Sequence, residues 1–105
     1  MTEDKLTAEE KRTLLQLVRQ ALEMGVRGQK LPPLDFESMP VRLREDGVSF
    51  VTLTIGGNLR GCIGALEPYQ SLADDVREHA VAAALQDYRF PNVEPEELPK
   101  IEIEI

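Results

Sequence analysis

The sequence predicts a single α+β domain in which an antiparallel β-sheet is flanked by helices. Apolar residues recur at helical spacing in two stretches, residues 8–24 and 72–86. Between these stretches, two segments with a high proportion of β-favouring residues, 48–55 and 59–64, are separated by a glycine-marked turn that predicts a hairpin. Residues 101–105 alternate strictly between isoleucine and glutamate, which is typical of a strand with one buried face.

The helix predicted over residues 8–24 has a well-marked start. The Thr7 hydroxyl can accept a hydrogen bond from an early helical N–H, and Glu10 can reach back to the backbone of Thr7, which is a capping box. Gly25 follows the last apolar residue of the repeat and is expected to end the helix. The glycines and prolines of residues 25–40 then predict an irregular connection.

The predicted hairpin decides where the lone cysteine points. A two-residue loop can be Gly56-Gly57 or Gly57-Asn58, and both registers place Cys62 on the same face of the sheet. A three-residue loop would invert that face. We therefore expect the thiol to be a small buried hydrophobe, with a reactive or ligand-facing thiol as the alternative. The expected neighbours of the cysteine are three aliphatic residues of the preceding segment: Val51, Leu53 and Ile55.

The helix predicted over residues 72–86 begins after Ser71, a good N-cap residue, and most of its apolar arc is alanine. Its acidic residues lie on the polar side of the helical wheel, which favours a solvated face over a metal site: Asp74, Asp75 and Glu78. His79 is the only histidine, so a cysteine–histidine dyad would need it together with Cys62. Its place at the border of the apolar arc favours a packed, half-exposed side chain instead.

Composition excludes several function classes. The chain has 105 residues and a formal net charge of −7, which disfavours nucleic-acid binding because phosphate backbones require clustered lysine and arginine. A single cysteine rules out an internal disulfide and fits a reducing compartment. The apolar runs are far shorter than the ~20 residues that span a bilayer. We therefore expect a cytoplasmic protein without membrane contact, metal or cofactor.

The run Leu59-Arg60-Gly61-Cys62-Ile63-Gly64 resembles the hallmark of the AMMECR domain family. The agreement continues upstream over residues 47–53 and downstream over 72–74, 87–91 and 95–99. The resemblance implies an α+β domain with an antiparallel sheet and a cleft near the motif, and a biochemical activity that is not established. Members of the family are usually longer, so we expect residues 1–105 to form one such domain without the family's later portion.

The same resemblance implies candidate site residues and partners. It selects five residues as candidate contacts for a small anionic ligand or a protein partner: Arg60, Gly61, Cys62, Gly64 and Arg89. The two glycines would let a ligand or another backbone approach the strand. The alternative for Arg89 is a structural arginine that satisfies the C-terminal carbonyls of the preceding helix or pairs with Asp87. In microbes the family shares a context with Memo-type and radical-SAM proteins, which implies a binding or accessory module of a modification system. The alternative is a thiol-dependent enzyme that uses Cys62.

The predicted C-terminal strand, residues 101–105, has a further consequence. A terminal strand with alternating apolar residues leaves a pairing edge unless another segment covers it. We expect self-association through this strand, which would make the protein a homo-oligomer.

Overall fold

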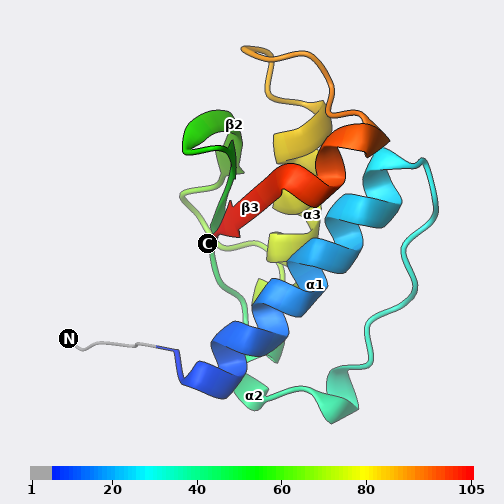
Figure 1. Ribbon diagram of the computed structural model, residues 1–105. Helices are drawn as coiled ribbons and strands as arrows, with labels where there is room; N and C mark the ends of the chain where they lie inside the picture. The colour runs from blue at the N-terminus through cyan, green and yellow to red at the C-terminus, as the bar shows by residue number, and fades with distance from the viewer. Residues whose placement is uncertain (1–5) are drawn as a thin grey trace.

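The computed structural model describes residues 6–105 and confirms the predicted α+β class (Figure 1). The elements follow in the order α1 (Ala8–Val26), η1 (Phe36–Ser38), α2 (Val41–Arg44), β1 (Phe50–Ile55), β2 (Asn58–Gly64), α3 (Leu72–Leu85), η2 (Pro95–Lys100) and β3 (Ile101–Glu104), where η marks a short 3₁₀ helix. The strands form one antiparallel sheet in the order β2-β1-β3.

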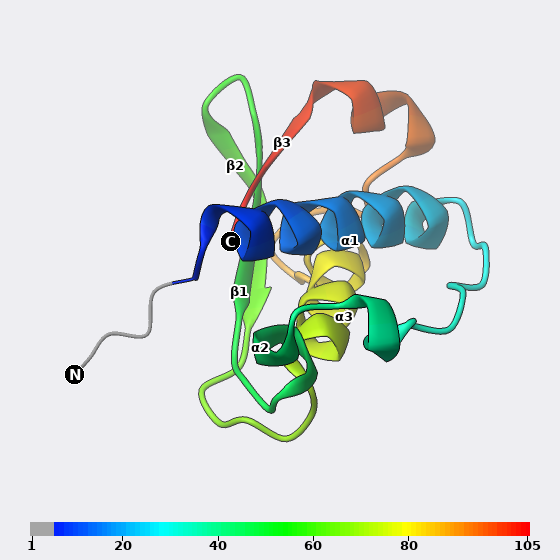
Figure 2. The ribbon, with the colours of Figure 1, turned by 90° about the horizontal axis from the view of Figure 1, so that it is seen from below.

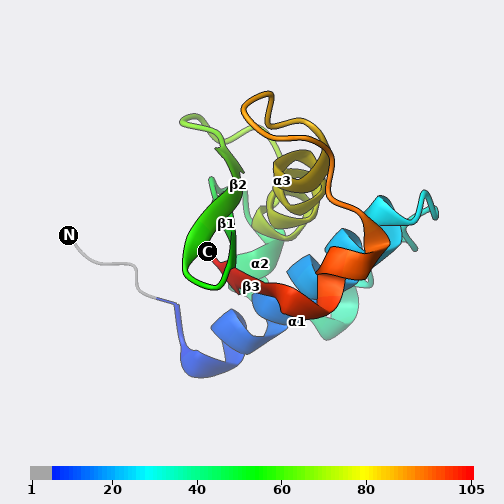
Figure 3. The same cartoon turned by 45° about the horizontal axis from the view of Figure 1, so that its top comes forward.

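Both long helices lie on the same side of the sheet (Figures 2 and 3). α3 packs against β1 and β2, while α1 packs against α3 and reaches β3. The core lies between these layers and is built from aliphatic residues of α1, alanines of α3 and the inward residues of the strands. Among the helices of residues 6–105, none combines the length and apolar character needed to cross a membrane.

α1 starts as predicted but ends later. The Thr7 hydroxyl accepts from the Glu10 backbone N–H at 3.1 Å, and the Glu10 carboxylate accepts from the Thr7 N–H at 2.8 Å. The expectation that Gly25 ends the helix was wrong, because α1 continues through Val26 and the residue with positive φ is Gly28. Gly25 has a packing role instead, since a Cβ there would lie 2.7 Å from Cγ2 of Val81 on α3.

The connection after α1 is irregular, as predicted, but it contains η1, and α2 follows directly after Pro40. α2 is a single turn that places Leu43 fully in the core. A helix of four residues is too short to show a helical repeat in the sequence, so no local pattern predicted it.

The hairpin turn has the predicted two-residue loop, Gly56-Gly57, with φ angles of 58° and 83°. The pairing then shifts by one residue: Leu53 pairs with Gly61, whereas Thr54 pairs with Leu59. Arg60 is therefore the extra residue of a β-bulge.

This bulge overturns the expected orientation of the cysteine. Cys62 pairs with Thr52 and lies on the outer face of the sheet, not beside the aliphatic side chains of β1. Gly61 takes the inward position in its place, opposite the fully buried Leu53. A one-residue shift moves every following side chain of a strand to the other face.

Gly61 brings α3 into close contact with the sheet. A Cβ built on Gly61 would overlap the carbonyl oxygen of Ala83, a backbone atom in the last turn of α3. The small side chains of α3 and the missing side chain of Gly61 therefore belong to one interface. The second helix starts as predicted, with the Ser71 hydroxyl accepting from the Asp74 N–H at 3.0 Å.

The C-terminal strand is confirmed, and β3 pairs with β1 from Thr52↔Glu104 to Ile55↔Ile101. Ile101 is buried and Ile103 is partly buried, whereas both glutamates are exposed. η2 forms a short helical turn that leads directly into β3.

The substitution Gly61→Ala tests the contact between β2 and α3. Because the added methyl meets a helix carbonyl that cannot rotate away, we expect the free energy of unfolding to fall by about 3 kcal/mol, the upper end of overpacking costs. The matched variant is Gly28→Ala, whose Cβ meets nothing within 4 Å but whose φ is 73°, and it should cost only about 1 kcal/mol. Urea titration measures both values, and equal costs would contradict the close contact.

Candidate functional site

Arg60 clasps the segment that follows α3. Its Nε and Nη2 donate to the two carboxylate oxygens of Glu97 at 2.8 and 3.1 Å. Its Nη1 donates to the carbonyl of Pro91 at 2.9 Å, and Nη2 also reaches the carbonyl of Asn92 at 3.3 Å. The hydrogen bond from Arg60 holds the pKa of Glu97 below its usual range. The guanidinium is therefore committed to contacts within the chain.

Asp87 connects the motif strand to Arg89. Its Oδ2 accepts the backbone N–H of Cys62 at 3.0 Å. Arg89 donates to both carboxylate oxygens, from Nε at 2.9 Å and from Nη2 at 2.7 Å. The Asp87 residue is 4% exposed, so its charge is compensated almost entirely by these donors. The bond from Arg89 holds the pKa of Asp87 well below its usual range, and the Cys62 N–H adds to this effect.

The thiol of Cys62 lies in a polar, partly exposed setting. Its Sγ is 3.2 Å from Oγ1 of Thr52, the residue opposite it on β1. Residues on the same face of the sheet keep partial or full exposure, including Phe50 and Glu104. This is not the apolar environment of an inert core cysteine.

Arg89 lies beside the thiol and is accessible. Its side chain is 47% exposed and stacks over the ring of Phe90 at 5.5 Å from the centroid. The interaction with Asp87 raises the pKa of Arg89 further, so the guanidinium stays charged. We call the group of Thr52, Cys62 and Arg89 the Cys62 surface; Thr52 contacts the thiol, and Asp87 joins the Cys62 backbone to Arg89.

The structure brings together only part of the predicted set. Cys62 and Arg89 meet on one carboxylate, whereas Arg60 turns to Glu97 and the carbonyls beside it. Gly61 faces α3 and admits its backbone, which was one of the two expected reasons for a glycine there. Gly64 lies against the ring of Phe50, which occupies the space that a side chain would take.

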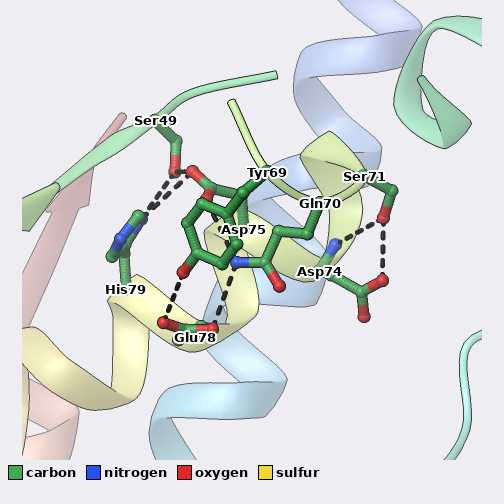
Figure 4. Close-up of polar contacts among 8 residues, drawn as sticks. All are labelled: Ser49, Tyr69, Gln70, Ser71, Asp74, Asp75, Glu78 and His79. Carbon is green, nitrogen blue, oxygen red and sulfur yellow. Dashed lines mark hydrogen bonds and ion pairs between the residues drawn. The ribbon is translucent and has the colours of Figure 1, made fainter. Parts of the chain in front are cut away.

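A second polar cluster was missed by the sequence analysis (Figure 4). Oδ2 of Asp75 accepts from the Ser49 hydroxyl at 2.7 Å and lies 3.1 Å from Nδ1 of His79, while Oδ1 accepts from Gln70 at 3.1 Å. The expectations for this helix were wrong in part: Asp75 is fully buried, not solvated, and His79 is only 4% exposed.

This cluster connects the start of β1 to α3 and does not form a nucleophile–base pair. The Ser49 hydroxyl donates to Asp75, and its oxygen approaches the same ring nitrogen of His79 that faces the carboxylate. Nδ1 of His79 is thus engaged here while Cys62 contacts Thr52 and Asp87, so the two residues form no dyad. Nearby, the Tyr69 hydroxyl donates to Glu78 at 2.7 Å, which raises the pKa of Tyr69 to about 12.

Comparison with known proteins supports the motif-based resemblance. A model of the AMMECR1 family matches residues 15–105. A protein of Methanothermobacter thermautotrophicus is 45% identical over 100 residues, which cover 95% of this chain and 52% of the relative. A protein of Methanosarcina barkeri is 44% identical over 103 residues, which cover 95% of this chain and 50% of the relative. The chain therefore spans about half the length of the curated relatives it matches.

A solved structure shares the fold. The crystal structure of the uncharacterized protein PH0010 from Pyrococcus horikoshii superposes with a TM-score of 0.86 at 31% sequence identity. The match covers 95% of this chain and 51% of the other. The arrangement of helices and strands described above is thus similar to that of half of a longer protein.

The substitution Asp87→Asn tests the connection between Cys62 and Arg89. We expect it to lower the free energy of unfolding by about 2 kcal/mol at pH 7, since it weakens hydrogen bonds to a charged group. Because folding lowers the pKa of Asp87, its contribution is complete above about pH 4, the range of an unfolded aspartate, and is lost as the pH falls further. Urea titration at several pH values should therefore show a smaller loss of unfolding free energy for the variant than for the wild type as the pH falls below 5.

The control is the substitution Glu96→Gln, which changes an exposed glutamate of η2. Identical acid profiles for Asp87→Asn and the wild type would contradict this role.

The substitution Arg60→Lys tests whether Arg60 is structural. An ammonium cannot reproduce the paired bonds to Glu97 together with the bonds to two carbonyls, so we expect a loss of about 2 kcal/mol in unfolding free energy. Arg77→Lys is the matched change, because Arg77 donates to a single carbonyl, that of Pro32, and it should cost under about 0.5 kcal/mol. A neutral effect of Arg60→Lys in thermal unfolding would argue against the clasp.

Proposed function

Since the chain belongs to the AMMECR1 family, we propose that it is a binding or accessory module whose contact surface is the Cys62 surface. The observation that supports this most directly is the shared carboxylate of Asp87, which holds the backbone of Cys62 and the guanidinium of Arg89 side by side. We infer that the Cys62 residue and the Arg89 guanidinium are within reach of one partner at this edge of the sheet. A partner can contact both without any change in the backbone.

The guanidinium of Arg89 gives this surface its chemical preference. Its Nε and one Nη2 bond serve Asp87, and Nη1 has no hydrogen-bond partner within residues 6–105. A guanidinium with free N–H groups recognises carboxylate or phosphate oxygens. The ligand that fits is therefore a small anion, or an acidic group on a protein surface.

Context supplied by the family resemblance extends the proposal. The partner protein would be of the Memo or radical-SAM type, and the module would act in a modification system. Because a lone thiol persists in a reducing compartment, we place the module in the cytoplasm. The relatives are about twice as long, so the proposal concerns the part of the family domain that this chain represents.

The second candidate is a thiol-dependent enzyme. Its support is the contact of 3.2 Å between Sγ of Cys62 and the Thr52 hydroxyl, which could donate a hydrogen bond to a thiolate. A threonine hydroxyl is not a general base, however, and a thiol nucleophile needs an adjacent base or a lowered pKa. The geometry thus favours a thiol that contacts a ligand over one that attacks it.

One experiment separates the two candidates. The alkylation rate of Cys62 by iodoacetamide is measured against pH, with and without inorganic phosphate as the anionic probe. For a binding module we expect Cys62 to be labelled no faster than a free cysteine derivative at the same pH. Phosphate should slow the labelling by about twofold or more, because an anion held by Arg89 lies next to the thiol and disfavours the thiolate.

Two variants complete the measurement. Arg89→Ala should abolish the effect of phosphate, whereas Arg77→Ala, which removes an arginine that donates to Pro32, should preserve it. Labelling much faster than that of a free cysteine derivative at pH 7 would favour the enzyme instead. Labelling that is indifferent to phosphate in the wild type would remove the anion from the proposal.

A further inference from the structure

The turn between α3 and η2 holds an aromatic side chain away from the rest of the fold. Tyr88 is 95% exposed, the largest exposed fraction among the large hydrophobic residues described. Its hydroxyl has no hydrogen-bond partner within residues 6–105, whereas the hydroxyl of the other tyrosine, Tyr69, donates to Glu78. Neither packing nor hydrogen bonding within residues 6–105 therefore explains a tyrosine at position 88.

The backbone of this turn is fixed at both ends. The Phe90 N–H donates to the carbonyl of Asp87 at 3.0 Å, which closes the turn around Tyr88 and Arg89. Asp87 itself is buried, and the N–H of the buried Val93 donates to a carbonyl in the last turn of α3 at 2.9 Å. A contact made from an ordered backbone costs less conformational entropy, so this turn is preorganised for binding.

A guanidinium lies beside the exposed ring. The bond to Asp87 is the main cause of the raised pKa of Arg89, and Cys62 and Tyr88 add smaller electrostatic contributions, so both lie close to the guanidinium. Nη1 of Arg89 has no hydrogen-bond partner within residues 6–105 and can donate to a further acceptor. We call Tyr88 and Arg89 together the turn tip. It presents aromatic surface and one positive charge at adjacent positions.

The shape of the turn tip indicates what kind of molecule it can bind. Small-molecule sites are concave and bury most of the surface of the ligand. A side chain with 95% exposure lies outside any concavity formed by residues 6–105, so the turn tip cannot enclose a small molecule. A protruding ring can instead be enclosed by a second molecule. Tyrosine and arginine are among the residue types enriched at such anchors, which fill pockets near the centre of protein interfaces.

Charge narrows the chemistry of the enclosing pocket. The Asp87 carboxylate already accepts from Arg89 and from the Cys62 N–H, so the donor that the turn tip leaves open is Nη1 of Arg89. A carboxylate at the rim of the pocket would accept from it, whereas a basic rim would be repelled. The net charge of −7 disfavours a partner surface that is acidic throughout. The pocket that fits is therefore apolar inside, with an acidic group on the side that faces Arg89.

We propose that Tyr88 inserts into an apolar pocket of a partner protein and that a carboxylate at the rim of this pocket binds Arg89. The inference rests on the proposed function and deepens it, because it makes the partner of the Cys62 surface a protein and not a small anion. Asp87 keeps the guanidinium oriented while the rim carboxylate accepts from Nη1. The ring supplies the buried apolar area, and the charge pair supplies the orientation.

The test uses two ring-shaped hosts as minimal models of such a pocket. β-Cyclodextrin has an apolar cavity that holds a phenol ring, and its carboxymethyl derivative adds acids at the rim. Titration of the complete chain with each host is followed by NMR of the aromatic ring protons. We expect both hosts to enclose Tyr88 in preference to Tyr69, whose hydroxyl is bound to Glu78. Tyr88→Ala should lose this binding, and Tyr69→Ala should keep it.

The preference for carboxylate is measured as the affinity for the carboxymethyl host divided by the affinity for the neutral host. Arg89→Ala should lower this ratio about threefold, the effect of one charge pair at an exposed position. The matched variant is Arg77→Ala, which removes the same charge from α3 and so corrects for the change in net charge. It should keep the ratio of the wild type.

Three results would overturn the inference. The first is that neither host encloses Tyr88, and the second is an equal ratio for Arg89→Ala and Arg77→Ala. The third is that phenyl phosphate slows the labelling of Cys62 more strongly than inorganic phosphate does, and only when Tyr88 is present, which would assign the turn tip to a small aromatic anion. Inorganic phosphate tests the proposed function separately. If it slows the labelling of Cys62 while the hosts fail to bind, the proposed function stands and this inference falls.

Discussion

The contact between Gly61 and the Ala83 carbonyl determines how α3 sits on the sheet, and the geometry of the site depends on it. Any side chain at position 61 would push the helix away from β2. The bulge at Arg60 and this contact are linked, because the bulge is what turns Gly61 inward. The same shift turns the next residue outward, so close packing on one face and the exposed position of Cys62 on the other share one cause.

The two edges of the sheet are closed by different means. Along β2, the Asp87 carboxylate takes the outward N–H of Cys62, and Arg60 holds the segment from Pro91 to Glu97 beside the strand. Along β3, Arg19 covers the first carbonyl only, and the exposed glutamates protect the rest by charge. Charged side chains on an edge prevent pairing with like strands while they leave the hydrogen-bonding groups available.

Local signals predicted the elements well, and long-range contacts account for what was missed. The capping residues Thr7 and Ser71, the glycine pair of the hairpin and the alternation of residues 101–105 all act within a few residues of where they stand. The bulge at Arg60 places Gly61 against α3, which follows later in the chain, and the residues around the bulge did not predict it.

The Asp75 cluster was missed for a similar reason. A helical wheel shows which residues share a face of the helix, but it does not show which residues from other parts of the chain contact them. Ser49 from the start of β1 and Gln70 from the preceding loop satisfy the buried carboxylate, and neither belongs to the helix. Among the candidate site residues, the contacts of Arg60 could not be predicted from the sequence, because Glu97 and the nearby carbonyls become its partners only on folding.

The motif divides into residues that build the fold and one that does not. Arg60, Gly61 and Gly64 make contacts within the fold, and these contacts do not depend on what the domain binds. The bond from Cys62 to Asp87 uses the backbone N–H, which serine or alanine would supply equally well. Packing therefore gives no reason for a thiol at this position. The chain's net charge of −7 also repels free anions at long range, but salt screens that field beyond about 8 Å. Arg89 can thus attract an acidic group at short range despite the negative net charge of the chain.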